Sequence, residues 1–133
     1  MVVNIIIQPD YKNTVWCKET MSGIDERICA RRYKKQILQK EDLCKETGRL
    51  IVVGTSPKWV SEILGTAQEL GINCVTVSCQ ILEKAHSTSF VLMDHGNATL
   101  DCIGYLNSCE RSRIALFGII ENSFADKTKA TFF

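Results

Sequence analysis

The chain has 133 residues, enough for one domain with a real hydrophobic core. Sixteen Lys and Arg residues face fifteen Asp and Glu residues, and a net charge of +1 gives no sign of the basic excess that nucleic-acid binding normally needs. No apolar run approaches the roughly 18 residues of a membrane span, and the opening MVVNIII lacks the basic region and cleavage site of a signal peptide.

The first half of the chain alternates apolar runs with segments of helical period. Pro9 ends the first apolar run, and either Asn13 or Thr14 can cap the helix that follows. Ser56 followed by Pro57 is a strong helix start. The expected elements are, in order, a strand over Val2–Gln8, a helix from Asn13 to about Arg31, a strand over Gln36–Gln39, a short helix or loop over Glu41–Gly48, a strand over Leu50–Val53 and a helix over Pro57–Leu70.

The second half continues the alternation with shorter elements. Asn97 can cap the third helix, whose apolar residues begin at Ala98. The expected elements are a strand over Cys74–Val77, a strand over Phe90–Met93, a helix from Asn97, a strand over Ile114–Phe117 and a helix over Ser123–Phe133. Short apolar strands alternating with amphipathic helices predict an α/β fold, with a parallel sheet flanked by helices.

Three of the clearest strands end in small polar clusters. These clusters are Pro9–Asn13, Gly54–Ser56 and Ser78–Gln80. Polar residues make turns, so any one cluster is explained without a ligand. Because the carboxyl ends of parallel strands meet at one edge, where such sheets bind ligands, the three together predict a ligand-binding edge.

Motifs for catalysis and cofactors are missing. GxGxxG, GxxxxGK[ST] and GxSxG do not occur, so the usual signatures of dinucleotide, triphosphate and nucleophile-elbow sites are absent, and we expect no cofactor. Asp94 and His95 could suggest acid–base chemistry, but no third residue with a matching role can be named, and a turn is favoured.

Seven cysteines are present, an odd number at irregular spacing and without a CxxC pair. This usage is typical of reduced, mostly buried thiols, and we expect a cytoplasmic protein. His86 and His95 lie near Cys79, but their spacing fits no common zinc pattern, so we expect no metal site.

The segment FVLMDHGNATLDCIGYLNSCERSRIALFGIIENSFADKTKATFF, residues 90–133, combines several motifs in a fixed order. A short strand ends in Asp94, a helix carries Ala98 and the pair Tyr105–Leu106, and RIALFG follows a basic cluster. This order resembles the effector-sensing domain of bacterial LacI/GalR-type transcriptional regulators, a domain related to periplasmic sugar-binding proteins. IIIQPDYKNTVW, GRLIVVGTSP and GINCVTVS resemble the first, third and fourth strands of the same domain with their loops.

The resemblance implies two α/β lobes joined by crossover strands, with a small ligand bound between them. A sugar or similar polyol needs carboxylates and amides for its hydroxyl pairs and an aromatic face for stacking. Trp16 has a rival interpretation as a core aromatic of its helix. The implied ligand residues are Asp10, Tyr11, Asn13 and Trp16 in a first wall, Thr55 and Ser56 in a second, and Thr76 and Ser78 in a third.

The chain departs from the family pattern at both ends. The family's DNA-binding headpiece would lie before the first strand, and most of the second lobe would follow the last helix. Residues 1–92 would then be the first lobe, and residues 93–133 the crossover and an incomplete second lobe. Such a piece would leave an apolar helix face and a strand edge uncovered.

The resemblance therefore predicts the small-molecule sensing domain of a bacterial transcriptional regulator, with a sugar as the expected ligand, and not an enzyme. DNA would be contacted only through a headpiece outside this chain, and a homodimer is expected through the helix Pro57–Leu70 and the loop Cys79–His86. Two alternatives stay open: a fragment of a periplasmic-type sugar-binding protein, and a small α/β enzyme with Cys79 as its nucleophile.

Overall fold

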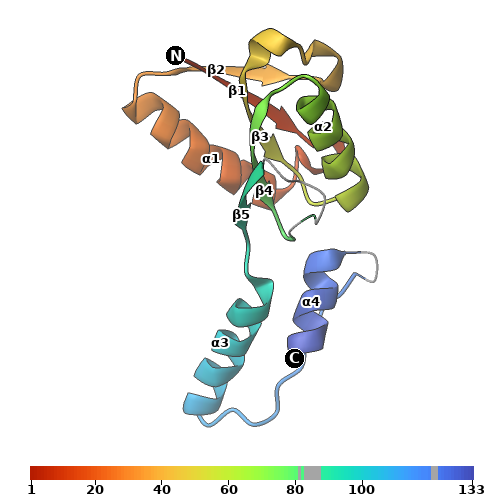
Figure 1. Ribbon diagram of the computed structural model, residues 1–133. Coiled ribbons are helices and arrows are strands. Elements are labelled where there is room, and N and C mark those ends of the chain that lie inside the picture. The colour runs from red at the N-terminus through yellow and green to blue at the C-terminus, as the bar shows by residue number, and fades with distance from the viewer. Residues whose placement is uncertain (81, 83–87, 121–122) are drawn as a thin grey trace. The chain divides into compact units, whose positions relative to one another are not determined.

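Two units, Met1–Leu92 and Met93–Phe133, make up the chain in the computed structural model (Figure 1). The structure describes residues 1–80, 82, 88–120 and 123–133. The first unit holds a five-stranded parallel sheet in the order β2-β1-β3-β4-β5. Its elements are β1 (Val2–Ile7), α1 (Val15–Ala30), β2 (Lys34–Leu38), β3 (Arg49–Val53), α2 (Pro57–Glu69), β4 (Asn73–Ser78) and β5 (Thr88–Leu92), with single 3-10 turns η1 (Pro9–Tyr11), η2 (Lys40–Asp42) and η3 (Lys45–Thr47).

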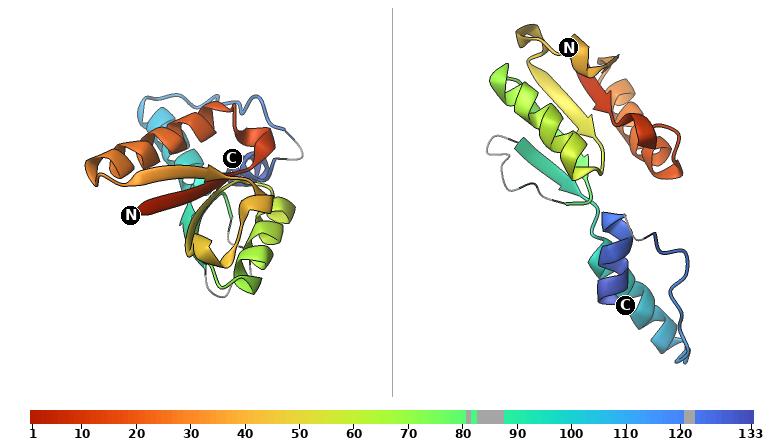
Figure 2. Two further views of the ribbon diagram at one scale, coloured as in Figure 1. Left: turned by 90° about the horizontal axis from the view of Figure 1, so that it is seen from above. Right: turned by 90° about the vertical axis from the view of Figure 1, so that its right-hand side faces the viewer.

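The two helices of this unit cover opposite faces of the sheet, as both views of Figure 2 show. On one face, Ile63 and Ala67 of α2 pack in a cluster with Val52 of β3. On the other, Cys17 and Ile28 of α1 pack with Ile5 and Val53. Parallel sheets need apolar cover on both faces, and this explains why the two central strands β1 and β3 consist largely of Ile, Leu and Val.

Local signals set the ends of both helices. Thr14 caps α1, because its hydroxyl oxygen accepts from the backbone N–H of Cys17 at 3.2 Å. Ser56 caps α2 with Pro57 at the first helical position, as predicted. Gly71 follows α2 with a φ of +71°, a left-handed conformation that glycine adopts without strain.

The predicted α/β fold class is confirmed, and each of the five strands of the first unit overlaps its predicted range. The segment predicted as a short helix or loop, Glu41–Gly48, forms the 3-10 turns η2 and η3. The edge strand β2 carries Lys34 and Lys35, which discourage pairing with another chain, whereas the other edge strand, β5, carries no charge.

The second unit consists of α3 (His95–Ser108), an extended segment and α4 (Phe124–Phe132). The two helices pack closely at Gly96, where a Cβ atom would lie 3.0 Å from the ring of Phe132. A groove of about 320 Å³ between α3, residues 114–116 and α4 is lined mainly by apolar side chains. Within the described residues, no helix of either unit is long and apolar enough to span a membrane.

Two sequence-based expectations are wrong in the second unit. Ile114–Phe117, predicted as a strand, forms none, because the described part of this unit contains no other strand with which it could pair. Phe117 is consequently 98% exposed. The cap of α3 is Asp94 and not Asn97: the Asp94 carboxylate accepts from the backbone N–H of Asn97 at 3.0 Å.

Candidate functional site

The three polar clusters lie along one edge of the sheet, because β1, β3 and β4 are parallel neighbours. The backbone N–H of Gln8 donates to the carbonyl of Val53 at 2.9 Å, and that of Gly54 donates to the carbonyl of Val77 at 3.2 Å. The ladder thus continues just past the strand ends and aligns the loops that follow. We call the loops Pro9–Asn13, Gly54–Ser56 and Ser78–Gln80, together with Gln8, the carboxyl edge.

The strand order places a topological switch point at this edge. The chain leaves β1 toward β2 on one side and leaves β3 toward β4 on the other. Between two such strands the connections diverge and open a crevice beyond the carboxyl ends, which is where α/β sheets bind ligands. Gln8 and Gly54, the residues that follow β1 and β3, lie at this switch point.

The side chain of Gln8 joins the end of β1 to the loop that follows β3. Its carboxamide oxygen accepts from the backbone N–H groups of Thr55 at 3.1 Å and Ser56 at 3.0 Å, and the residue is only 3% exposed. Gly54 is required beneath this contact. A Cβ atom there would lie 2.8 Å from the ring of Trp59 and 3.0 Å from the Gln8 oxygen. Backbone and side chains are therefore tightly interlocked at the centre of the carboxyl edge.

An aromatic pair stands on the β1 side of the edge. The rings of Tyr11 and Trp16 meet edge to face, with centroids 6.2 Å apart and planes at 85°. Thr14 fixes the loop between them, since its hydroxyl donates to the carbonyl of Tyr11 at 2.7 Å. Trp16 also packs against the core cluster under α1. It is therefore part of the core and, through its contact with Tyr11, also borders the carboxyl edge.

The predicted ligand residues differ in how accessible they are. Asp10 and Asn13 are exposed, while Tyr11, Trp16, Thr55 and Ser56 are half-buried. Ser56 is already engaged, because its hydroxyl oxygen accepts from the backbone N–H of Trp59 at 3.4 Å. Ser78 is buried, but it lies at the end of β4 and borders the edge.

Thr76 lies apart from the other predicted residues. It pairs in register with Val52 and Phe90 inside the sheet and is fully buried. Its hydroxyl oxygen has no hydrogen-bond partner among the described residues. This unsatisfied group lies behind the carboxyl edge, so a ligand at the edge meets the side chains of the outer residues first.

Two glutamines of the edge were not singled out by sequence reasoning. Gln8 reads as the polar end of the first strand, and only the fold brings it to Thr55 and Ser56. The side-chain nitrogen of Gln80 is buried and has no hydrogen-bond partner among the described residues. A buried donor without a partner is unfavourable, so a ligand oxygen at Gln80 would satisfy it.

The carboxyl edge contains Cys79, whereas Cys17 and Cys74 are buried in the core. Burial raises the pKa of the Cys17 thiol and raises that of the Cys74 thiol to about 11, so both are neutral at physiological pH. His86, which is close to Cys79 in the sequence, lies outside the described residues. In the part of the chain that the structure describes, no group of three or more His, Cys, Asp or Glu side chains could hold a metal ion.

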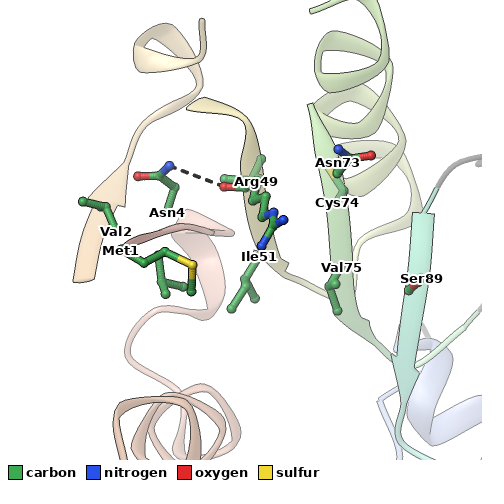
Figure 3. Close-up of a pocket in the computed structure, with 11 residues that line it drawn as sticks. Met1, Val2, Asn4, Arg49, Ile51, Asn73, Cys74, Val75 and Ser89 are labelled. Atoms are coloured by element: carbon green, nitrogen blue, oxygen red, sulfur yellow. Dashed lines mark hydrogen bonds between the residues drawn. The ribbon is translucent and has the colours of Figure 1, made fainter. Parts of the chain in front are cut away.

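A separate hollow of about 370 Å³ lies near the start of the strands (Figure 3). Figure 3 shows Ile51 and Val75 pointing to the same side from neighbouring strands. Asn4 stands at the hollow, where its side-chain nitrogen donates to the carbonyl of Thr47 at 2.9 Å. The lining is largely apolar and belongs to the amino ends of the strands, at the opposite edge of the sheet from the switch point.

Comparisons with known proteins found no matching family model, no matching curated protein and no matching solved structure.

Proposed function

We propose that the first unit is the ligand-sensing lobe of a bacterial transcriptional regulator of the LacI/GalR type, and that its ligand is a small polyhydroxylated molecule such as a sugar. The observation that carries the proposal is the carboxyl edge. Polar loops from three adjacent parallel strands meet there at a switch point, together with an aromatic pair and a buried amide nitrogen that has no partner among the described residues.

The chemistry of the edge suits a sugar. Tyr11 and Trp16 offer aromatic surface against which the C–H face of a sugar ring stacks. Asp10, Asn13 and Gln80 offer carboxylate and amide groups, which bind neighbouring hydroxyls in pairs. Thr55 and Ser78 add hydroxyls at the second and third walls.

The wider regulator assignment rests on the sequence resemblance. It makes residues 1–92 the first lobe and residues 93–133 the crossover and the beginning of the second lobe. It also makes the protein a cytoplasmic homodimer that reaches DNA through a headpiece outside this sequence. Reading the coding sequence on both sides of this segment tests the assignment, because a helix-turn-helix upstream and further α/β elements downstream are expected.

A ligand titration tests the site itself. We would titrate a panel of neutral monosaccharides into ¹⁵N-labelled protein and follow the backbone amides. A ligand at the edge should give saturable shifts at Thr55, Ser56 and Gln80, with weak affinity because only one lobe supplies contacts.

A matched pair of variants locates the binding. Tyr11→Ala should abolish the shifts, while Tyr33→Ala, a half-exposed tyrosine just before β2 at the other end of the sheet, should leave them unchanged. Equal loss in both variants, or the absence of saturable shifts with every sugar, would argue against this function.

The enzyme alternative makes a different prediction. If Cys79 were a nucleophile, it would react with iodoacetamide at neutral pH much faster than the exposed Cys44 of the same chain. Mass spectrometry of the alkylated peptides separates the two thiols, and equal or slower labelling of Cys79 would exclude this activity.

A further inference from the structure

The start of α2 is the position at the carboxyl edge where doubly wound folds bind anionic groups. Backbone N–H groups and the helix dipole both point outward there, and phosphates or carboxylates bind them readily. In this protein the position lies beside the switch point, in the loop Gly54–Ser56 and the first turn of α2. Which groups accept hydrogen bonds from these N–H groups therefore affects which ligands can bind at the carboxyl edge.

Protein groups already occupy almost all of these donors. Gln8 accepts from the N–H groups of Thr55 and Ser56, and the hydroxyl of Ser56 accepts from Trp59. Pro57 has no N–H, and that of Val60 is bonded to the Ser56 carbonyl within the helix. Within the described stretch 55–60, this leaves only the N–H of Lys58.

The occupant is neutral and firmly held. Gln8 is 3% exposed, and its carboxamide oxygen sits against the position that a Gly54 side chain would fill. To bind these N–H groups, an anion would first have to displace the side chain from two hydrogen bonds in a buried position. A carboxamide oxygen satisfies the donors without bringing a negative charge into the site.

We infer that Gln8 is a specificity-determining residue, which fills the anion position at the start of α2 and restricts the carboxyl edge to uncharged ligands. This inference deepens the proposed function and rests on it for the location of the ligand. It excludes phosphorylated or carboxylated molecules whose anionic group would dock at α2, in agreement with a neutral sugar as ligand.

Inorganic phosphate is a direct probe. We would titrate it into wild-type protein and Gln8→Ala, with sodium chloride at matched ionic strength as the reference, and follow the amides of Thr55 and Ser56 by NMR. Wild type should show no saturable shift beyond the chloride reference, and Gln8→Ala should show one. Saturable binding to wild type, or no binding to a folded Gln8→Ala, would overturn the inference.

Gln8→Glu keeps the test available if Gln8→Ala does not fold. The new carboxylate would accept from Thr55 and Ser56, and we expect these two hydrogen bonds to outweigh its burial and to lower its pKa below the usual value of about 4.3 for Glu. The stabilising contribution of this carboxylate should therefore be complete above a pH of about 4.3 and should be lost as the pH falls through the lowered pKa. Gln36→Glu, on the exposed part of β2, is the matched control and should show no such dependence. Parallel pH profiles for the two variants would contradict the inference.

The phosphate titration uses no sugar, so its outcome is separable from that of the sugar panel. A negative panel would count against the proposed function without changing the phosphate result. Phosphate binding by wild type would overturn the restriction to neutral ligands even if a sugar also bound.

Discussion

The carboxamide oxygen of Gln8 and the backbone nitrogen of Ser56 lie 3.0 Å apart, joining the end of β1 to the residue that caps α2. The same oxygen accepts from Thr55, 47 positions away in the sequence. Gln8 therefore connects the first wall of the candidate site to the second. Its position couples the local order of the edge to the stability of the fold.

Replacing Gln8 by alanine should lower the free energy of unfolding by about 1–3 kcal/mol, because two buried N–H groups lose their acceptor. Chemical denaturation followed by tryptophan fluorescence measures the change. Gln36→Ala, an exposed glutamine of β2, should change stability by less than about 0.5 kcal/mol. Similar losses in both variants would show that the Gln8 contacts contribute little.

Replacing Gly54 by alanine should be destabilising by about 1–3 kcal/mol, because the added methyl group would overlap the Trp59 ring and the Gln8 oxygen. Both neighbours are constrained, one by core packing and the other by two hydrogen bonds. Amide spectra of the variant should also shift at Thr55 and Ser56.

Gly65→Ala is the matched control for that substitution. Gly65 lies within α2, and nothing lies within 4 Å of its Cβ position. Alanine there should stabilise the protein by roughly 0.5–1 kcal/mol, since it has the higher helix propensity. Thermal unfolding of the two variants should thus move in opposite directions, and a stabilising Gly54→Ala would refute the packing argument.

Sequence patterns predicted the first unit well because its signals are local. Apolar runs specify the buried strands, and the Ser56–Pro57 pair fixes the start of α2 within the chain itself. The strand predicted over Ile114–Phe117 was wrong because strand formation does not depend on local signals alone. Its apolar residues favour a strand, but a strand also needs a neighbouring strand, which no local pattern can supply.

The candidate site was predicted less completely than the fold. Its position at the ends of parallel strands follows from the order of elements, but the burial of Thr76 depends on its register against Val52. The role of Gln8 depends on a contact across 47 positions. The Gln80 side-chain nitrogen, which has no partner in the part of the chain that the structure describes, matters only because it is buried. Each of these features appears only when the chain is packed.

The buried Cys74 thiol should make stability depend on alkaline pH. Burial raises its pKa from 9.0 to about 11, so above pH 9.0 the unfolded chain loses the proton first. The contribution is fully present below pH 9.0 and declines as the pH rises toward 11. Urea unfolding of wild type and Cys74→Val at several alkaline pH values isolates the contribution of this thiol. As the pH rises, wild type should lose stability relative to the variant. Parallel loss of stability in both proteins would show that Cys74 is not its cause.

The cap of α3 gives a prediction for the second unit. Asp94 accepts from the backbone N–H of Asn97, and this hydrogen bond holds the pKa of the Asp94 carboxyl below its ordinary value. Asp94→Ala should therefore speed hydrogen exchange at the Asn97 amide severalfold and reduce helicity, while Asp94→Asn should retain most of the protection because its side-chain oxygen also caps helices.

The pH dependence of that cap has a defined direction. Because the folded-state pKa of Asp94 is lowered, its contribution is present above the ordinary value of 3.8 and is lost as the pH falls through the lowered value. Asn97→Ala tests the competing assignment, since Asn97 only donates its side-chain amide to the other Asp94 oxygen. That variant should unfold α3 less than Asp94→Ala does. A larger effect of Asn97→Ala would mean that Asn97 is the true start of the helix, as its residue type alone had indicated.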